Sequence, residues 1–396
     1  MGRRGRGEGQ VRKRKDGRWE ARITVGYDPE TGVQKRYSRY FKTRKEAQDW
    51  LAQVLVEKNR GTFVEPHEIT LGEWLDWWLE VYKESTCRRT TRDNYETMVR
   101  VHIKPALGHI PLLKLEARHL QEFYNNKAKE KSIRTVHLLH YIIGAALDQA
   151  VEEGKLPRNV NEATKLPPMR KKKEITPLSP EEVRKFLETA KNDRLYAAFL
   201  LEMATGLRRG ELLALKWEDV DFEKGFVHVR RTVARVKARG GPKKTELIYQ
   251  EPKTEKSREP VPVPAAVLEE LKRHRAKQEE EKALFGTAYQ DGGLVFCTPD
   301  GKQLDPSNFL RRYKSILRRA GLPPSSFHAL RHTVATLLLE AGEELKNVQE
   351  LLRHARLDIT ADLYAKVTER LKKKVSAKVE EVILRGIQNG EAPERS

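Results

Sequence analysis

The residues from 68 to 168 carry apolar side chains at the spacing of an α-helix, and this periodicity constrains the fold more than any other feature of the chain. Thr70 and Glu73 form a capping box at the start of the first run. Because the apolar positions fall on one helix face, their aromatic rings are expected in a core rather than on a base-stacking surface. Further helices are expected at about 89–104, 115–128 and 131–153. The stripe of the first helix consists of Leu71, Trp74, Leu75, Trp78, Leu79 and Tyr82.

The residues from 1 to 64 instead alternate apolar and polar side chains, as a half-buried β-strand does. Asp16-Gly17 is a hairpin signal ahead of a strand at 19–25, and a further strand is expected at 33–41. Together these signals predict a three-stranded sheet backed by one helix. A capping box at Thr43 and Glu46 would begin that helix, whose apolar face consists of Ala47, Trp50, Leu51, Val54 and Leu55.

Three arginines, Arg18, Arg22 and Arg36, are expected on the open face of this sheet. A narrow sheet can enter the major groove of DNA, where guanidinium groups pair with base edges. These arginines are therefore candidate DNA contacts, and the alternative is that they are ordinary solvated side chains. The linker after residue 168 is also basic. Its Lys171 and Lys172 either lie along the phosphate backbone of DNA or are simply solvated.

The residues from 176 to 390 mix helices with a short sheet. Ser179 and Pro180 are a strong helix start, strands are expected at 226–236 and 257–264, and the pattern is helical again from about 306. The expected fold class is a multidomain chain, mainly α-helical with small β-sheets. Its expected domains are a three-stranded sheet plus helix at 1–64, a helical domain at 68–168 and a mixed α+β domain at 176–390.

The chain has 77 Lys and Arg against 57 Asp and Glu, a net charge of +20 at pH 7. Such an excess suits a polyanionic partner, with nucleic acid as the first candidate, although abundant Glu, Lys and Arg also fit a heat-stable surface. The two cysteines form no metal or redox motif. No apolar run approaches membrane-spanning length, and the basic N-terminus lacks the apolar core of a signal peptide. We therefore expect a protein of the bacterial cytoplasm.

Four short motifs in the third segment carry side chains suited to phosphate chemistry. In two of them the charged residues lie three positions apart, so each pair shares one helix face. Another presents a lysine within Pro-Lys-Thr, between two expected strands. In chain order the motifs contain Arg208 with Glu211, Lys253, His328 with Arg331, and His354 followed ten residues later by Tyr364.

The order Arg, Lys, His-x-x-Arg, His, Tyr resembles that of the tyrosine recombinases of the phage-integrase type, over the whole third segment. The helical segment resembles the core-binding domain of that family, and the first segment resembles the arm-binding domain of integrases from mobile elements. The resemblance implies a site-specific DNA recombinase that integrates or excises a mobile element, with Tyr364 as nucleophile. One departure is Arg353, where the family usually has glycine before the histidine.

The residue types fit this chemistry. Strand exchange without an energy source needs a covalent intermediate that conserves the phosphodiester energy, and the hydroxyl of Tyr364 can supply a phosphotyrosyl ester. Negative charge builds on the non-bridging phosphate oxygens in the transition state, where the guanidinium groups of Arg208 and Arg331 can bind them. The carboxylate of Glu211 is expected to brace Arg208 rather than to touch the substrate.

The departing 5′-oxygen needs a proton, and Lys253, which matches the family's Pro-Lys-Thr position, is the expected donor, with Lys256 as the weaker alternative. His328 and His354 can accept the Tyr364 proton or hydrogen-bond the phosphate, and the division between them stays open. His332 is expected in the core.

No metal and no ATP are expected, because the motifs contain neither an Asp/Glu cluster nor a Gly-rich phosphate loop. The expected partners, by resemblance, are core and arm sites on double-stranded DNA, three further copies of the chain in a tetramer, an excisionase and a DNA-bending host protein. A helix expected at 369–385 would dock on a neighbouring subunit or on its own domain.

Two alternatives stay open. One is an architectural DNA-binding protein without catalysis, which the intact set of catalytic residue types argues against. The other is a type IB topoisomerase or a housekeeping recombinase that resolves chromosome dimers, and the separate N-terminal module argues against the housekeeping version.

Overall fold

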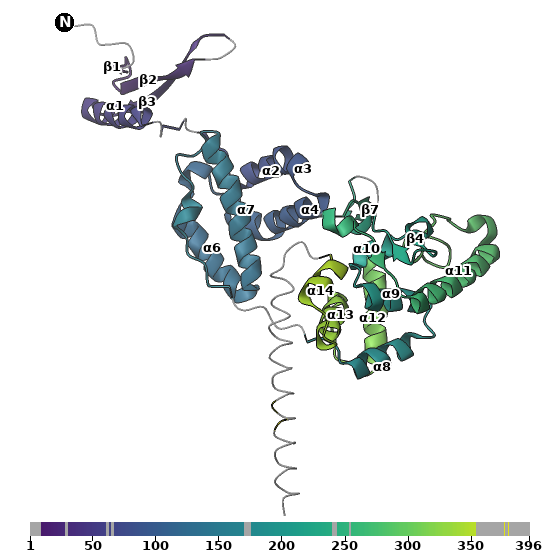
Figure 1. Cartoon of the computed structure of the whole chain (residues 1–396). Helices are drawn as coiled ribbons and strands as arrows, with labels where there is room; N and C mark the ends of the chain where they lie inside the picture. The colour runs from purple at the N-terminus through teal and green to yellow at the C-terminus, as the bar shows by residue number, and fades with distance from the viewer. Residues whose placement is uncertain are drawn as a thin grey trace, which may run out of the picture. The chain divides into compact units, whose positions relative to one another are not determined.

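The computed structural model describes residues 9–27, 31–60, 63–64, 67–169, 176–239, 244–252, 255–353, 376 and 379. The chain divides into two compact units, Met1–Lys171 and Lys172–Ser396. The first unit contains a small sheet with its helix and a set of helices, and the second contains helices with short strands (Figure 1).

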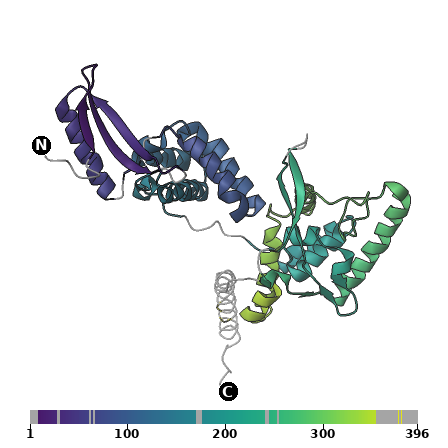
Figure 2. The same cartoon turned by 90° about the horizontal axis from the view of Figure 1, so that it is seen from above.

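The N-terminal sheet is antiparallel with strand order β1-β2-β3, and helix α1 lies along one face of it (Figure 2). Ala21 and Ile23 of β2 are fully buried against Ala47 and Leu51 of α1. The predicted capping box of Thr43 is present, so the predicted sheet and helix are confirmed. The elements are β1 (Gln10–Lys13), β2 (Trp19–Tyr27), β3 (Gln34–Phe41) and α1 (Arg44–Asn59).

The helical part of the first unit has a separate core. Trp74 and Trp78 are buried, as their spacing predicted, and the Trp74 indole Nε1 donates a hydrogen bond to the carbonyl of Ala146 at 2.7 Å. The expected helix at 89–104 has a π-helical turn at Val99–Ile103. The helices are α2 (Leu71–Val81), α3 (Lys83–Thr86), α4 (Arg89–Met98), α5 (Lys104–Leu107), α6 (Ala117–Glu130) and α7 (Ile133–Glu152).

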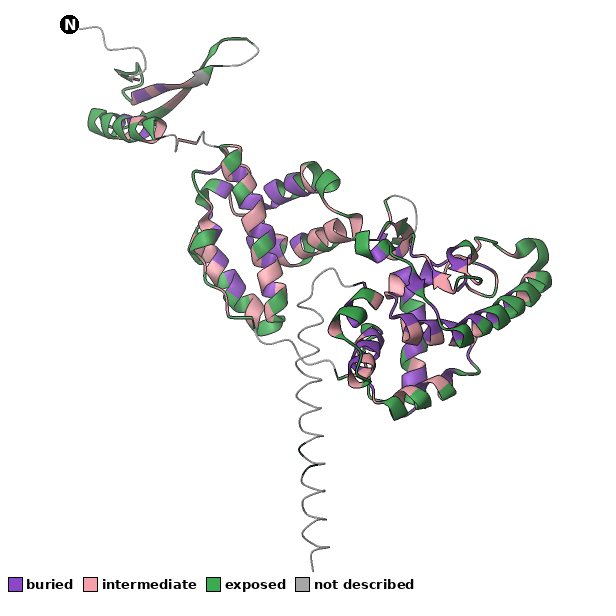
Figure 3. Cartoon of the chain, in the orientation of Figure 1, coloured by how far each residue is buried: buried purple, intermediate pink, exposed green. Residues whose placement is uncertain are grey.

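The helices of the second unit surround one large core. In the view coloured by burial, α13 is mostly buried while α11 is exposed along much of its length (Figure 3). The predicted start of α8 at Ser179 is confirmed, with a capping box to Glu182. The helices are α8 (Pro180–Ala190), α9 (Tyr196–Thr205), α10 (Arg209–Leu213), α11 (Ala265–Phe285), α12 (Pro306–Arg319), α13 (His328–Glu340) and α14 (Leu345–Leu351).

The strands of this unit are shorter than predicted. The expected strand at 226–236 is interrupted and changes sheet, and most of 257–264 is not strand. Pro260, Pro262 and Pro264 have no N–H to donate to a ladder, so that segment pairs at only two residues. A 3₁₀ turn, Glu255–Arg258, precedes it. The strands are β4 (Val220–Asp221), β5 (Phe226–Val227), β6 (Thr232–Lys237), β7 (Thr245–Gln250) and β8 (Val261–Pro262).

None of the helices within the described part of the chain combines the length and the apolar character needed to span a bilayer.

We predict that Leu75→Ala lowers the free energy of unfolding of the helical domain by about 2–5 kcal/mol, because this side chain is fully buried in its core. Urea unfolding followed by tryptophan fluorescence would measure the change. Leu113→Ala is the matched control, since Leu113 is 38% exposed and its truncation should leave no comparable cavity. Equal losses from the two variants would contradict the packing described here.

Candidate active site

Two turns meet at the centre of the second unit. Helix α9 ends at Gly206, whose φ of 59° is left-handed, and α10 begins three residues later. A Cβ atom at Gly206 would lie 2.4 Å from Leu352 Cδ2, so glycine is required both by the backbone and by the close approach of the turn after α14. This contact brings the Arg208 motif beside the residue that precedes Arg353.

Arg208 occupies the N-cap position of α10. Its Nη1 donates to Glu211 Oε1 at 2.9 Å and to Ser257 Oγ at 3.1 Å, and its backbone N–H donates to Glu211 Oε2 at 3.1 Å. The expected brace between Glu211 and Arg208 is therefore present. The Arg208 side chain remains 38% exposed while Glu211 is 4% exposed, so the guanidinium is accessible and its carboxylate partner is not.

Arg331, on α13, is buried behind this pair, with 2% exposure. Its guanidinium donates hydrogen bonds to the carbonyl oxygens of Gly206 and Leu352, and so ties the two turns together. Burial and the nearby Arg208 lower the pKa of Arg331 to about 9, which leaves it cationic at neutral pH.

His328 begins α13, and its ring lies edge-on to that of His332, with 4.9 Å between the ring centroids. Burial, followed by the positive charges of His332 and Arg331, lowers the pKa of His328 to about 4. At neutral pH the imidazole is uncharged, so it can accept a proton or share a hydrogen bond. His332, expected in the core, is only partly buried.

A third arginine, Arg353, also faces this cluster. It is 1% exposed and donates to Glu211 Oε2 at 2.8 Å and to the Ser257 carbonyl at 2.7 Å. Sequence reasoning noted the unusual residue but gave it no role, and missed Ser257 entirely because that residue was expected in a strand.

The charges of the cluster favour an anion. Glu202 is buried nearby, and burial raises its pKa well above the usual range of a carboxyl, which disfavours its charged form. The guanidiniums of Arg208, Arg331 and Arg353 in any case outnumber the carboxyl groups of Glu202 and Glu211. This excess of positive charge, partly open to solvent at Arg208, suits a phosphate group. Among the described residues, no three His, Cys, Asp or Glu side chains are grouped to hold a metal ion.

The structure thus brings together Arg208, Glu211, His328 and Arg331. Lys256 is exposed in the 3₁₀ turn that also holds Ser257. The other predicted catalytic residues, Lys253, His354 and Tyr364, and the two linker lysines, Lys171 and Lys172, lie outside the described residues. The expected helix at 369–385 lies there too, apart from the isolated residues 376 and 379.

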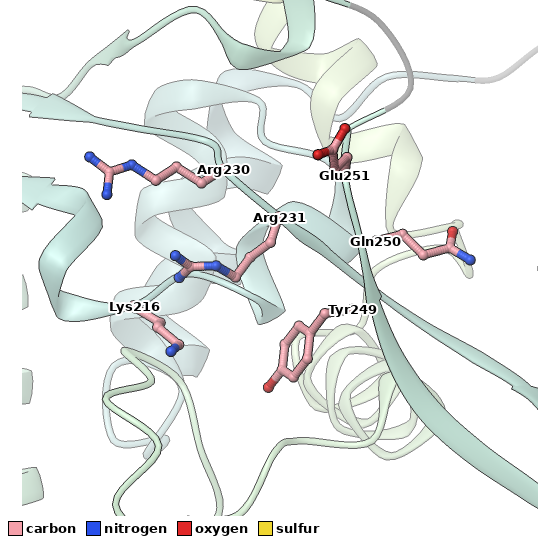
Figure 4. Close-up of a pocket in the computed structure, with 6 residues that line it drawn as sticks. All are labelled: Lys216, Arg230, Arg231, Tyr249, Gln250 and Glu251. Carbon is pink, nitrogen blue, oxygen red and sulfur yellow. The ribbon is translucent and has the colours of Figure 1, made fainter.

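A shallow basic pocket of about 360 Å³ lies at the base of the β6–β7 hairpin. Lys216, Arg231 and Tyr249 point into the same space (Figure 4). Arg231 is already paired with Asp219 and Glu218, at 2.8 Å each. The pocket is therefore less positive than its lysine and arginines alone would suggest.

The open face of the N-terminal sheet carries the predicted arginines. Arg22 pairs across the strands with Ser38, and the next pair on that face joins Thr24 to Arg36. The Arg18 guanidinium lies 5.8 Å from the ring centre of Tyr40. Arg22 is partly buried and hydrogen-bonded within the sheet. It donates to Ser38 Oγ and to the buried carboxylate of Glu20, at 3.1 and 2.8 Å.

The cluster has the charge and the partial exposure that a phosphate group requires, and comparisons with known proteins show which family the chain belongs to. Family models match residues 177–370 to the phage integrase family, 70–128 to the N-terminal SAM-like domain of phage integrases and 10–58 to an arm DNA-binding domain. A tyrosine recombinase XerC-like protein of Caldanaerobacter subterraneus is 38% identical over 88% of this chain and 92% of its own length. The chain belongs to the phage integrase family of tyrosine recombinases, enzymes that cleave and rejoin DNA.

Further similarity is found to an integrase sequence and to solved structures of integrases. An integrase of Streptomyces ambofaciens is 30% identical over 92% of this chain and 93% of its own length. Among solved structures, the Tn1549 transposon integrase in complex with transposon right end DNA matches with a TM-score of 0.63, at 19% identity, over 78% of this chain and 99% of that one. A lambda integrase tetramer bound to a Holliday junction matches with a TM-score of 0.56, at 20% identity, over 91% and 96%. These structures share the fold, which confirms the predicted fold class.

The low pKa of His328 predicts a specific pH dependence. In the unfolded chain the imidazole titrates near 6.5, so stability due to the neutral ring is fully present above pH 6.5 and is lost as the pH falls toward 4. NMR titration of the His328 ring should find no midpoint near 6.5. His332→Asn should raise the midpoint, because one repelling charge is removed, without restoring 6.5, since burial is the larger cause. A wild-type midpoint near 6.5 would contradict this assignment.

Proposed function

We propose that this site-specific recombinase integrates and excises a mobile element, with Tyr364 as nucleophile and Arg208, Lys253, His328, Arg331 and His354 as the other catalytic residues. The observation that carries the proposal is the meeting of Arg208 and Arg331 at the Gly206 turn, beside a neutral His328. Two guanidiniums and an uncharged imidazole, contributed by two separate motifs, form a site for one phosphate group and one proton.

The reaction follows from these groups. The Tyr364 hydroxyl attacks the phosphorus, its proton passes to a histidine, and a 3′-phosphotyrosyl ester forms as the bond to the 5′-oxygen breaks. Arg208 and Arg331 stabilise charge on the non-bridging oxygens. Lys253, or Lys256, gives the 5′-oxygen its proton. Attack by the 5′-hydroxyl of another strand then reverses the step and releases the tyrosine. Each step exchanges one phosphoester for another, so no metal or nucleotide is needed.

The domains would divide the DNA between them. Residues 68–168 and 176–390 would enclose the crossover site, with Lys171 and Lys172 of the linker along the backbone. Residues 1–64 would bind separate arm sites through Arg18, Arg22 and Arg36. Four copies on two duplexes form the proposed working complex, by analogy with the lambda integrase tetramer on a Holliday junction. An excisionase and a DNA-bending host protein would set its direction in the bacterial cytoplasm.

Covalent trapping on DNA tests whether Tyr364 is the nucleophile. With nicked duplexes tiled across both ends of the element that encodes the chain, the wild type should form a covalent protein–DNA adduct in excess EDTA. Tyr364→Phe should form none, because it lacks the attacking oxygen while keeping the ring. A denaturing gel separates the adduct from free DNA.

Each result of that experiment discriminates among the functions. An adduct that persists in Tyr364→Phe would refute the nucleophile. Sequence-specific binding with no adduct would favour an architectural DNA-binding protein. Adducts and relaxation on any supercoiled plasmid, without site preference, would instead indicate a topoisomerase.

Substitutions on the N-terminal sheet and on its helix test which face of this domain binds DNA. Arg36→Ala should weaken binding to the arm sites by about 1–3 kcal/mol if its guanidinium reads a base edge. Lys45→Ala on α1 is the matched control, since Lys45 is also exposed but lies on the helix that covers the opposite face. Electrophoretic mobility shifts at fixed salt would measure both. An equal effect of the two substitutions would mean that the sheet face is not the binding surface.

A further inference from the structure

The backbone of Arg353 has a conformation that is unfavourable for any residue other than glycine. Among the described residues it is the one non-glycine with a positive φ, at 53°. An L-residue in this left-handed region is strained by the clash of its Cβ with the backbone, and glycine adopts it freely. A side chain retained here must therefore make contacts that offset the strain.

The side chain is also buried, with 1% exposure. Burying a guanidinium is costly unless it is paired and hydrogen-bonded. Arg353 Nη2 donates to Glu211 Oε2 at 2.8 Å and Nη1 to the Ser257 carbonyl at 2.7 Å, while its buried Nε has no hydrogen-bond partner in the structure. The pairing is incomplete, and two further guanidiniums lie in the same cluster. A buried ion pair is weak evidence for stability, whereas the directions of its hydrogen bonds do fix the positions of the groups that it joins.

That geometry is a closed ring of four residues. Glu211 binds Arg208 through Oε1 and Arg353 through Oε2. Ser257 accepts from Arg208 with Oγ and from Arg353 with its carbonyl. Arg208 and Arg353 thus share both partners, and neither partner can rotate without breaking a bond to one of the arginines. The carboxylate of Glu211 cannot swing away from Arg208 while Arg353 holds its other oxygen.

We infer that Arg353 is a positioning residue for Arg208: through Glu211 and Ser257 it fixes the orientation of the exposed guanidinium that binds the scissile phosphate. The inference rests on the proposed function, since it concerns the same site. The ring also joins three of the sequence motifs, because Ser257 follows Lys253 by four residues and Arg353 directly precedes His354.

The test uses the full-length chain and the nicked duplexes described above, with the rate of adduct formation measured in single turnover per folded molecule. Arg353→Gly should lower that rate on the order of 10- to 100-fold, because a small displacement of a phosphate-binding group is costly. The DNA dissociation constant should stay within about twofold, since the rest of the interface contributes most of the affinity. Arg353→Lys should recover only part of the rate, because an ammonium lacks the planar fork.

Two comparisons separate positioning from general stabilisation. Arg312→Met breaks another ion pair to a buried carboxylate, that of Asp193 at 2.7 Å, in which neither residue belongs to the ring. It should lower the melting temperature and leave the rate per folded molecule unchanged. In a Glu211→Gln background, Arg353→Gly should have less than about a third of its effect in the wild type, because its route to Arg208 is already weakened.

The outcomes are distinct. An unchanged rate in Arg353→Gly, or an effect of full size in the Glu211→Gln background, would overturn the positioning role. If Arg353→Gly does not fold, Arg353→Lys decides: full wild-type rate overturns the inference, and a reduced rate with intact DNA binding supports it. Failure of the wild type to form any adduct would overturn the proposed function, and the inference would fall with it.

Discussion

The carboxylate of Glu211 is the interaction on which the candidate site depends. It is nearly inaccessible to water and lies between two guanidiniums, one facing solvent and one enclosed by protein. Removing a buried anion from such a pair leaves an uncompensated charge, which is far more damaging than losing a surface ion pair. Burial raises the pKa of the neighbouring Glu202 and so disfavours its charged form, and the two carboxyl groups together balance only part of the charge of three arginines. The residual positive charge is what makes the cluster receptive to a phosphodiester.

A second constraint is that the site is assembled from the ends of several helices and from the turns between them. Arg208 starts a helix, Arg331 lies on a buried helix and Arg353 follows a third. The carbonyl groups of Gly206 and Leu352, at the C-terminal ends of α9 and α14, accept hydrogen bonds from Arg331. Carbonyl groups in this position have no partner within their own helices. One side chain therefore satisfies two orphan acceptors and orients the turns that carry its neighbours.

Much of this could be predicted from the sequence. Capping boxes located the starts of α1, α2 and α8, and helical spacing predicted the burial of Trp74 and Trp78, because both signals are local. Motif order predicted that Arg208, His328 and Arg331 would meet. The ring through Ser257 and Arg353 could not be predicted. It depends on the left-handed backbone conformation of Arg353 and on a 3₁₀ turn at Ser257, where a strand was expected. Likewise, no alternation pattern indicates that Glu20, on the polar face of its strand, is buried beneath Arg12 and Arg22.

The close approach at Gly206 has a further consequence. A Cβ atom at Gly206 would lie 2.4 Å from Leu352 Cδ2, so there is no room for a methyl group between the Gly206 turn and the buried Leu352 side chain. Two motifs that are more than a hundred residues apart in the chain pack against each other here at a residue without a side chain. A side chain at Gly206 would have to displace Leu352, whose carbonyl, like that of Gly206, accepts a hydrogen bond from Arg331. Gly206, which carries no reactive group, thus determines how closely the two turns can pack.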